Sequence, residues 1–369
     1  MTRGVSSSMA CVHSHKLWSS EEFNKNTQII NDAFESRGDE ESDSTVATFS
    51  NEENESLEVN VIVQEMESIL KRSRLITRLQ SLNNFNLDQD ADGYLPFVCD
   101  NFTVGLVSPE VLHVLQQFPG VFTMSADSIS FNDHLDSLLS RSGALNSVLM
   151  ELSIRGFFSN ALNGWRNECY EIRNNFTDPT MFRVERAASP LLGVRKYGVQ
   201  INGYVRHASL GTCLWLQQRS VMKPTWPGMM DNFVGGGVTE GLSVAETAVK
   251  EAAEEAGVDA DLAAGLVPVG SVSFLHRTER GLHPNTEFVF DLELPQHFVP
   301  VNTDGEVGGW TLVPVHHLTD VVCSDKFKIT SAPVVIDFMV RWGFIEPDQE
   351  MIDLLHYPLD MIYNCSKLV

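Results

Sequence analysis

The amino-acid sequence predicts an α/β protein with two domains. Its 369 residues are enough for about two domains that each have a core. The first half mixes helix-like and strand-like stretches, which favours a small α/β or α+β domain. In the second half, two pairs of strand-like runs flank a glycine-rich loop and one strong helix. We expect the first domain over 61–186 and the second over 187–355.

The two ends of the chain are predicted to be tails, over 1–60 and 356–369. Between Glu21 and Asn60 there are 12 acids against Lys25 and Arg37, a local net charge of −10. Such a segment buries too little apolar surface to offset its ordering entropy. The first twenty residues lack Asp and Glu and contain several Ser, a faint transit-peptide composition. A flexible N-terminus is the favoured interpretation, and we expect a cytoplasmic protein.

The elements of the first domain follow from local signals. Apolar residues at helical spacing predict a helix over Val61–Leu82. The order Ser108, Pro109, Glu110 is typical of a helix start, so a short helix is expected over Val111–Phe118. A longer helix is predicted over Ala144–Arg155, because an apolar face runs along it and Gly156 follows.

Runs of β-branched and apolar residues in the second domain predict four strands. These runs are Val199–Arg206, Thr212–Arg219, Val267–Phe274 and Glu287–Leu294. A helix with one apolar face is expected near the end, over Ala332–Trp342.

Composition limits the classes of partner. The formal net charge of −23 argues against nucleic acid and anionic membranes as partners. The one basic cluster, Lys71, Arg72, Arg74 and Arg78, is small and reads as a solvated helix face. No apolar run reaches the ~18 residues of a membrane span. The six cysteines are widely spread without a CxxC pair, which favours reduced thiols over disulfides or zinc: Cys11, Cys99, Cys169, Cys213, Cys323 and Cys365.

The strongest local signals surround one helix of the second domain. Ser243 and Glu246 form a capping box, so the helix is expected to start near Val244, and Gly257 is its natural stop. One apolar stripe is expected to pack on another element: Ala245, Ala248, Val249, Ala252 and Ala256.

Three acids of this helix carry the predicted chemistry. Glu251, Glu254 and Glu255 stand at i, i+3 and i+4, so their carboxylates are expected to meet on one exposed face. A hard divalent cation, Mg²⁺ or Mn²⁺, would relieve their repulsion. The alternative is a solvated acidic face. Three consecutive glycines, residues 235–237, precede the helix and favour the cation, because they permit close backbone approach to a ligand.

The segment from Gly235 to Val258 resembles a Nudix box, G-x5-E-x7-R-E-U-x-E-E-x-G-U with U an aliphatic residue. Gly236 fits its first glycine, and the three acids, Gly257 and Val258 fit its end. Two positions depart: Leu242 replaces the first Glu, and Lys250 replaces Arg. The resemblance implies an α/β/α sandwich with a mixed sheet behind the smaller α/β domain. It also implies Mg²⁺-dependent (or Mn²⁺-dependent) hydrolysis of a small-molecule diphosphate.

A wider resemblance points to one Nudix subgroup, related to the Nudix portion of fungal thiamine pyrophosphokinase. It rests on Tyr197–Val205, Lys223–Asn232, Phe288–Pro295 and Asp304–Val307, and on Pro96-Phe97, Val104-Gly105 and Trp165–Glu168 in the first domain. Members pair an N-terminal domain of poorly defined function with a Nudix domain. The resemblance implies hydrolysis of thiamine diphosphate, or its oxo and oxy forms, to the monophosphate.

The expected site roles divide between metal binding, catalysis and substrate binding. Glu251, Glu254 and Glu255 would hold the metal ion, with Glu254, Glu255 or Glu306 in catalysis. Glu306 is explained almost as well by a surface turn. Expected substrate-binding residues, from the glycine loop and the segment before it, are Arg219, Lys223, Trp226, Gly236 and Gly237. Surface ion pairs are the alternative for Arg219 and Lys223, and packing for Trp226.

Two other functions compete with the hydrolase. The run from Lys223 to Asn232 also resembles isopentenyl-diphosphate isomerases, which need a Cys directly after that Asn. Phe233 stands there instead, which argues against the isomerase. A Nudix protein that binds a diphosphate without turnover is suggested by Leu242. The oligomeric state stays open.

Overall fold

The computed structural model describes residues 52–363, with side chains described from 64 to 361. The chain divides into two compact units, Met1–Val61 and Ile62–Val369. Residues 1–51 of the predicted acidic tail, Cys11, and residues 364–369 with Cys365 lie outside the described residues. Helix α2 (Glu52–Leu82) begins at Glu52 rather than near Val61. All described elements after α2 belong to the second unit.

The N-terminal part of this unit holds a small four-stranded sheet in the order β2-β1-β4-β3, with β1 and β4 parallel, and a separate β5–β6 hairpin. Its elements are α3 (Leu87–Asp90), β1 (Leu95–Cys99), β2 (Phe102–Val107), α4 (Pro109–Leu115), β3 (Phe122–Met124), β4 (Ile129–Phe131), α5 (Leu138–Ile154), α6 (Ser159–Leu162), β5 (Cys169–Ile172), β6 (Phe182–Glu185) and α7 (Ser189–Leu192). A separate α/β region therefore precedes the second sheet, as predicted.

Local capping explains where the helices of this region start. The Ser108 side chain accepts a hydrogen bond from the Val111 N–H, so the predicted helix start at Ser108-Pro109 is confirmed and α4 begins at Pro109. Helix α5 begins six residues before the predicted Ala144, because Ser137 and Ser140 form a capping box. The core of this region contains four phenylalanine rings whose neighbouring centroids lie 5.1–6.4 Å apart: Phe97, Phe122, Phe131 and Phe182.

The second sheet has the order β11-β12-β7-β8-β13, with β10 added to β7 and β9 to β8. Its strands are β7 (Lys196–His207), β8 (Gly211–Arg219), β9 (Met230–Asp231), β10 (Val234–Gly237), β11 (Val267–Thr278), β12 (Gly281–Glu293) and β13 (Val307–Pro314). Only β12 and β7 pair in parallel among these described strands, so the sheet is mixed. All four predicted strands are present, and three short or irregular ones (β9, β10 and β13) were missed.

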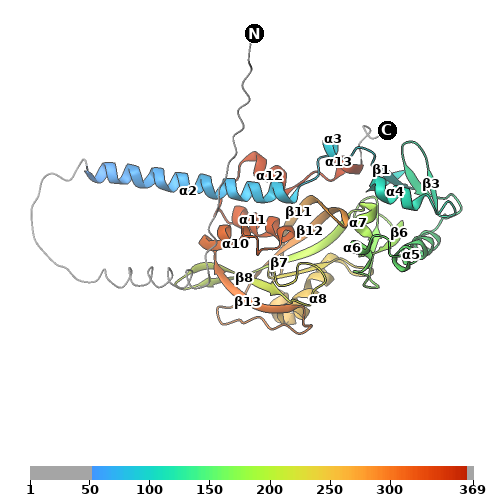
Figure 1. Cartoon of the computed structure of the whole chain (residues 1–369). Coiled ribbons are helices and arrows are strands. Elements are labelled where there is room, and N and C mark those ends of the chain that lie inside the picture. The colour runs from blue at the N-terminus through green and yellow to red at the C-terminus, as the bar shows by residue number, and fades with distance from the viewer. Residues whose placement is uncertain (1–51, 364–369) are drawn as a thin grey trace, which may run out of the picture. The chain divides into compact units, whose positions relative to one another are not determined.

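Helices cover both faces of this sheet (Figure 1). Helix α8 (Val244–Ala256) packs on one face through its alanines, against Val199 and Ile201 of β7. The other face carries the C-terminal part of α2 and the helices α10 (Leu318–Val322), α11 (Ala332–Arg341) and α12 (Gln349–Leu355). The remaining helical elements are α9 (Ala260–Ala263), η1 (Val315–His317), η2 (Ile329–Ser331) and α13 (Asp360–Tyr363). The predicted α/β/α sandwich is confirmed.

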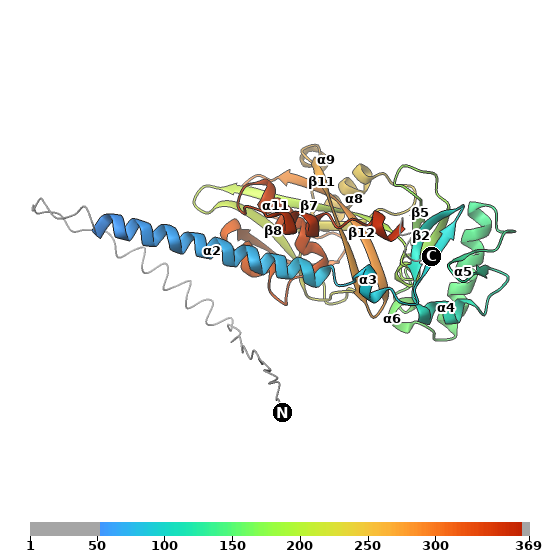
Figure 2. The ribbon, with the colours of Figure 1, turned by 90° about the horizontal axis from the view of Figure 1, so that it is seen from above.

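The two regions meet along the β11–β12 hairpin, which lies beside β2 in the view of Figure 2. Leu106 of β2 shares an apolar cluster with Leu275 of β11 and Leu282 of β12. A Cβ atom on Gly281 would lie 2.2 Å from the Pro190 carbonyl oxygen of α7, so only glycine allows this approach. The hairpin thus fixes where the N-terminal region stands relative to the glycine-rich strand β10.

The cysteines and the long helices bear on two predictions from the sequence, reduced thiols and the lack of a membrane span. The four cysteines within them, Cys99, Cys169, Cys213 and Cys323, are free thiols. None of the helices in the described part of the chain combines the length and hydropathy of a bilayer span.

Candidate active site

Helix α8 is built as its sequence predicts. Ser243 accepts from the Glu246 N–H, while the Glu246 carboxylate accepts from the Ser243 N–H at 2.9 Å. Gly257 ends the helix in the left-handed region at φ 64°. The buried face is narrower than predicted, because Val249 is 44% exposed and Ala245 is also exposed. Helix α8 therefore presents a fixed row of side chains to β10.

Two of the three predicted acids lie directly against the glycine strand. The Glu255 carboxylate accepts from the Gly235 N–H at 3.1 Å and from the Gln217 amide at 3.2 Å. A Cβ atom on Gly236 would lie 2.3 Å from the Glu251 Cδ, so a larger residue there would displace that carboxyl group. Gly236 is thus needed for close contact between strand and helix, whereas Cβ atoms on Gly235 and Gly237 would meet Gln200 and Tyr170.

Burial sets the electrostatics of this pair. Glu255 is only 2% exposed, so the prediction of an exposed acidic face was wrong for it. Burial raises the pKa of Glu255 to about 7; the Gly235 N–H opposes this rise and the nearby Glu251 adds to it. Burial also raises the pKa of Glu251, against the effect of Lys250. A divalent cation would offset both the burial and the repulsion.

Glu254 is placed differently from its two neighbours. Its carboxylate accepts from Lys250 Nζ at 2.6 Å, and its side chain is 44% exposed. Within residues 64–361, no group of three or more His, Cys, Asp or Glu side chains is arranged to hold an ion. The ligand set nevertheless suits a hard cation, because buried Glu255 and partly buried Glu251 offer carboxylate oxygens and Glu254 is held by one solvent-accessible ion pair.

A buried ion-pair network shapes the loop between β8 and β9. Asp231 accepts from Arg219 Nη1 at 2.9 Å, from Lys328 Nζ at 2.9 Å and from the Ser331 hydroxyl. Arg219 also donates to the carbonyl oxygens of Thr225 and Trp226, at 2.9 and 3.1 Å. With these bonds the Arg219 guanidinium supports the loop.

The loop holds Trp226 in an uncommon conformation. Its φ of 53° is in the left-handed region, which bulky residues seldom adopt, and its side chain lines a cavity. Lys223, from the same loop, forms an ion pair with Glu306, the residue before β13. Burial lowers the pKa of Lys223 to about 8, while the Glu255 carboxylate acts in the opposite direction. The predicted residues Lys223 and Trp226 therefore line one cavity with the glycine strand, and Glu306 lies beside it through its ion pair with Lys223.

These elements enclose a cavity of about 470 Å³, a size typical of small-molecule sites. Gly235, Gly236 and Gly237 line it. Seven cationic residues line it too, against the acids Glu279 and Glu287: Arg166, Arg186, Lys196, Arg219, Lys223, Arg280 and Lys328. A chain of net charge −23 thus concentrates positive charge in one cavity, which favours an anionic ligand.

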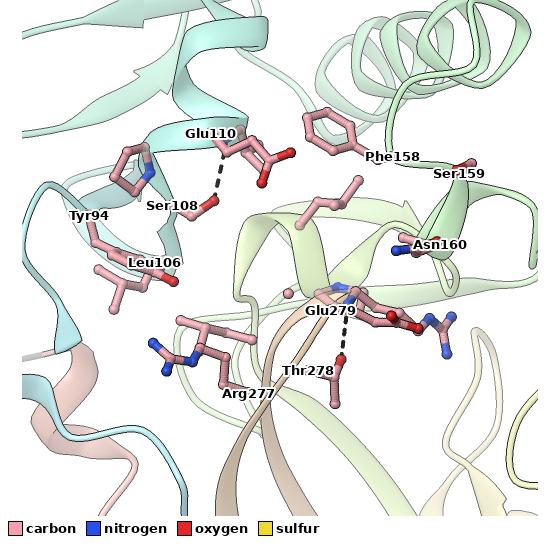
Figure 3. A pocket seen from close by; sticks show the side chains of 18 residues that line it. Tyr94, Leu106, Ser108, Glu110, Phe158, Ser159, Asn160, Arg277, Thr278 and Glu279 are labelled. Atoms are coloured by element: carbon pink, nitrogen blue, oxygen red, sulfur yellow. Dashed lines mark hydrogen bonds between the residues drawn. The ribbon is translucent and has the colours of Figure 1, made fainter.

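A second, larger cavity of about 600 Å³ lies on the other side of the β11–β12 turn. Figure 3 shows Ser108 and Glu110 of the α4 start, Ser159 and Asn160 of α6, and Arg277–Glu279 of the hairpin around it. No glycine of β10 lines this cavity, whereas Gly235, Gly236 and Gly237 all line the smaller one. Glu251 and Glu255 line neither cavity, but they lie against Gly236 and Gly235 of the smaller cavity's wall. We therefore assign the active site to the smaller cavity.

Comparison with known proteins shows which families the two regions match. Residues 197–334 match the NUDIX domain, and residues 74–196 match a domain of unknown function (DUF4743). Nudix hydrolase 20, chloroplastic, of Arabidopsis thaliana is 35% identical over 280 residues, covering 73% of this chain and 74% of that protein. Nudix hydrolase 24, chloroplastic, of the same plant is 37% identical over 258 residues, covering 69% of each chain. A crystal structure of DR0079 from Deinococcus radiodurans, 25% identical, covers 44% of this chain and 94% of its own, with a TM-score of 0.34.

The chain belongs to the Nudix hydrolase family. It is therefore an enzyme of a family that acts on small-molecule diphosphates and generally uses divalent metals. In this Nudix hydrolase, Lys250 replaces the Arg of the box and still contacts two of its acids, Glu254 at 2.6 Å and Glu251 at 3.4 Å.

The expectation of a cytoplasmic protein was wrong. Both Arabidopsis relatives are named as chloroplastic proteins. The sequence signal was the lack of acids in the first twenty residues, with Arg3, Lys16 and several serines, a composition that also fits a flexible end.

Sequence reasoning missed most of the cavity wall. Arg166, Tyr170 and Arg186 come from the N-terminal region, Arg280 from the β11–β12 turn and Lys196 from the start of β7. His283 also lines the cavity, with Nδ1 at 2.9 Å from Lys196 Nζ. These residues are far apart in sequence, so no local spacing could have grouped them.

Proposed function

We propose that this Nudix hydrolase is a Mg²⁺-dependent (or Mn²⁺-dependent) diphosphatase that converts thiamine diphosphate, or its oxidised forms, to the monophosphate. The observation that carries the diphosphatase proposal is strand β10: Glu251 and Glu255 pack against its glycines, and the same glycines line a cavity together with seven cationic residues. The thiamine part rests on the resemblance to the Nudix portion of fungal thiamine pyrophosphokinase, in Lys223–Asn232 above all.

In this proposal, Glu251, Glu255 and a re-oriented Glu254 hold the metal ion. When bound, the ion supplies positive charge that polarises phosphoryl oxygens. Glu254 must leave Lys250 to join it, and this ion pair is exposed enough to break at little cost. Glu255 or Glu306 would accept the proton of the attacking water. Both are proposed because Glu255 lies against the glycine strand and Glu306 beside Lys223.

The substrate-binding roles follow from placement in the cavity. The backbones of Gly236 and Gly237 give a diphosphate close access to β10, and Lys223 offsets part of its charge. Arg219 acts indirectly, since its donors support the loop. Trp226 offers a ring face for an aromatic substrate.

The cavity also contains groups that can read a polar ring. His283 contacts Lys196 through Nδ1 and Thr278 through Nε2, both at 2.9 Å. Glu287 is buried nearby, and burial raises its pKa to about 7, although Lys328 and Lys196 act against this rise. Hydrogen-bond donors and acceptors thus stand near an aromatic wall, which suits a nitrogen heterocycle better than a purely apolar group.

The direct experiment is a substrate panel. We would incubate the full chain and Mg²⁺ with thiamine diphosphate, its oxo and oxy forms, ADP-ribose and a dinucleotide, and measure released phosphate and monophosphate. The proposal expects thiamine compounds to give the highest kcat/KM and EDTA to abolish turnover. Higher kcat/KM for a nucleoside diphosphate derivative would reject the thiamine assignment while leaving the diphosphatase intact.

Variants test the site itself. Glu255→Gln and Glu251→Gln keep the side-chain volume and remove the charge, so we expect kcat to fall at least about 100-fold. Glu151→Gln, an exposed change on α5, is the matched control and should retain wild-type kcat. Full activity in both Glu255→Gln and Glu251→Gln would refute the metal assignment.

A further inference from the structure

Three arginines from two parts of the chain meet in the active-site cavity. Arg166 follows α6 and Arg186 follows β6, so both belong to the N-terminal region. Arg280 comes from the turn between β11 and β12 and also lines the cavity. The N-terminal region, whose family has no assigned function, thus supplies part of the wall of the Nudix site.

The N-terminal region is in direct contact with the glycine strand. A Cβ atom on Gly237 would lie 3.0 Å from the Tyr170 hydroxyl and 3.4 Å from Arg186 Nη2. The Arg186 guanidinium lies 5.4 Å from the centre of the Tyr170 ring. On the opposite side of the hairpin turn, Arg280 Nη2 would be 3.6 Å from a Cβ atom on Gly164. Arg186 therefore borders β10, the strand that Glu251 and Glu255 also contact, while Arg280 borders Gly164 of the N-terminal region.

These arginines are poorly compensated. Arg186 pairs with Glu168. The guanidinium groups of Arg166 and Arg280 form no ion pair with another residue of the described range. The Arg280 Nε atom is buried without a hydrogen-bond partner in that same range. Burial and neighbouring arginines lower the pKa of both Arg166 and Arg280, which shows that like charges are held together in a desolvated place.

An ordinary contact between two domains would pair its charges. Here Arg280 has a buried donor without a partner, and Arg166 lines the same cavity without an ion pair among the described residues. A buried unpaired donor costs about 1–3 kcal/mol unless a ligand satisfies it. Arginine presents a planar fork of donors that matches the oxygens of a phosphate. The cluster is therefore arranged for an anion with several oxygens.

We infer that the active site is composite: Arg166 and Arg186 of the N-terminal region and Arg280 of the β11–β12 turn bind a phosphate group of the diphosphate substrate. Tyr170 positions Arg186 beside Gly237. The meaning of this subsite for catalysis rests on the proposed function, but its ability to bind a diphosphate group does not require turnover. The N-terminal region is thereby a substrate-binding part of the enzyme.

The test uses the full chain and inorganic pyrophosphate in EDTA, so that no metal bridges the ligand to the carboxylates. Calorimetry would measure the Kd for wild type, Arg166→Gln, Arg280→Gln and the control Arg155→Gln, an exposed residue of the N-terminal region that pairs with Glu151. Arg166 and Arg280 are chosen because removing them breaks no ion pair among the described side chains. We expect Kd to rise at least tenfold in each variant and to stay within twofold in the control.

Two outcomes would overturn the inference. One is wild type that fails to bind pyrophosphate at millimolar concentration. The other is a Kd within twofold of wild type in both Arg166→Gln and Arg280→Gln. Either result is independent of the substrate panel. The proposed function is refuted if thiamine diphosphate is not hydrolysed, whereas the subsite is refuted if replacing the arginines leaves the Kd for pyrophosphate unchanged. Arg166→Lys, which keeps the charge and loses the fork, should bind with an intermediate Kd.

Discussion

Replacing Asp231 by Asn should strongly destabilise the protein, because this carboxylate is the shared partner of two cations. It is 3% exposed and contacts Arg219 and Lys328, both at 2.9 Å, and the Ser331 hydroxyl. An asparagine of the same shape would leave both cations beside a neutral amide. The perturbation therefore removes one charge without creating a cavity.

Two estimates bracket the loss of stability. Burial alone would raise the pKa of Asp231, but Lys328 and Arg219 lower it to about 2 from 3.8. At about 1.4 kcal/mol per tenfold change, the folded state then favours the charged form by about 2 kcal/mol more than the unfolded state does. Breaking a buried ion pair by removing one partner costs about 3–5 kcal/mol. We expect Asp231→Asn to lower the free energy of unfolding by about 2–5 kcal/mol.

The assay is urea denaturation followed by circular dichroism, with Asp261→Asn, an exposed change on α9, as the control. The control should change the free energy of unfolding by less than about 0.5 kcal/mol. Because the pKa of Asp231 is depressed in the folded state, its contribution is present above the unfolded pKa and is lost as pH falls toward about 2. The difference in the free energy of unfolding between wild type and Asp231→Asn should thus be constant near neutral pH and should decrease below about pH 4. A loss under about 1 kcal/mol at neutral pH would refute the reasoning.

Three further predictions concern the site and its helix. Gly236→Ala should reduce kcat at least about 100-fold, because the new Cβ would lie 2.3 Å from the Glu251 Cδ; near-normal kcat would show that α8 can shift. Ser243→Ala removes the capping box with Glu246 and should cost about 1 kcal/mol in urea denaturation, and an unchanged midpoint would contradict this. Burial, and to a smaller extent the charge of Lys196, lowers the pKa of His283 well below 6.5. As pH falls, this histidine therefore takes up a proton in the unfolded state before it does so in the folded state, which favours unfolding. The melting temperature should drop as pH falls below about 6.5, and His283→Asn should reduce that drop; parallel pH profiles would argue against it.

How much the sequence could predict depends on how local each signal was. Helix α8 was predicted with its first residue correct, because the capping box and Gly257 are local features. The start of helix α5 was predicted six residues too late, because its capping box is completed by a serine, Ser140, where an acid is usual. The mixed sheet and the sandwich came from a resemblance and not from periodicity. Strand β13 was missed because its two glycines hide the alternation of apolar residues.

The site itself was predicted only in part. Glu251 and Glu255 lie against the glycines, because helix and strand adjoin in sequence. The predicted exposed face of three carboxylates does not form, since Glu255 is buried and Glu254 pairs with Lys250. Burial was not predictable: the buried stripe of α8 includes Thr247 and Glu255 in place of Ala245 and Val249, which depends on how α8 lies across β7 and β10. The arginines of the wall depend on contacts between regions far apart in the sequence, which no spacing encodes.

The glycine strand explains why one cavity can serve both halves of the proposed chemistry. Gly236 turns toward the Glu251 carboxylate, and the next residue, Gly237, turns toward Tyr170 and Arg186. Because neighbouring residues of a strand face opposite sides, these contacts place negative charge on one side of β10 and positive charge on the other. A diphosphate held along this backbone would reach both sides only if no side chain intervened. The three glycines thus keep the acids and arginines within reach of one ligand while separating their opposite charges, which would otherwise pair and close the site.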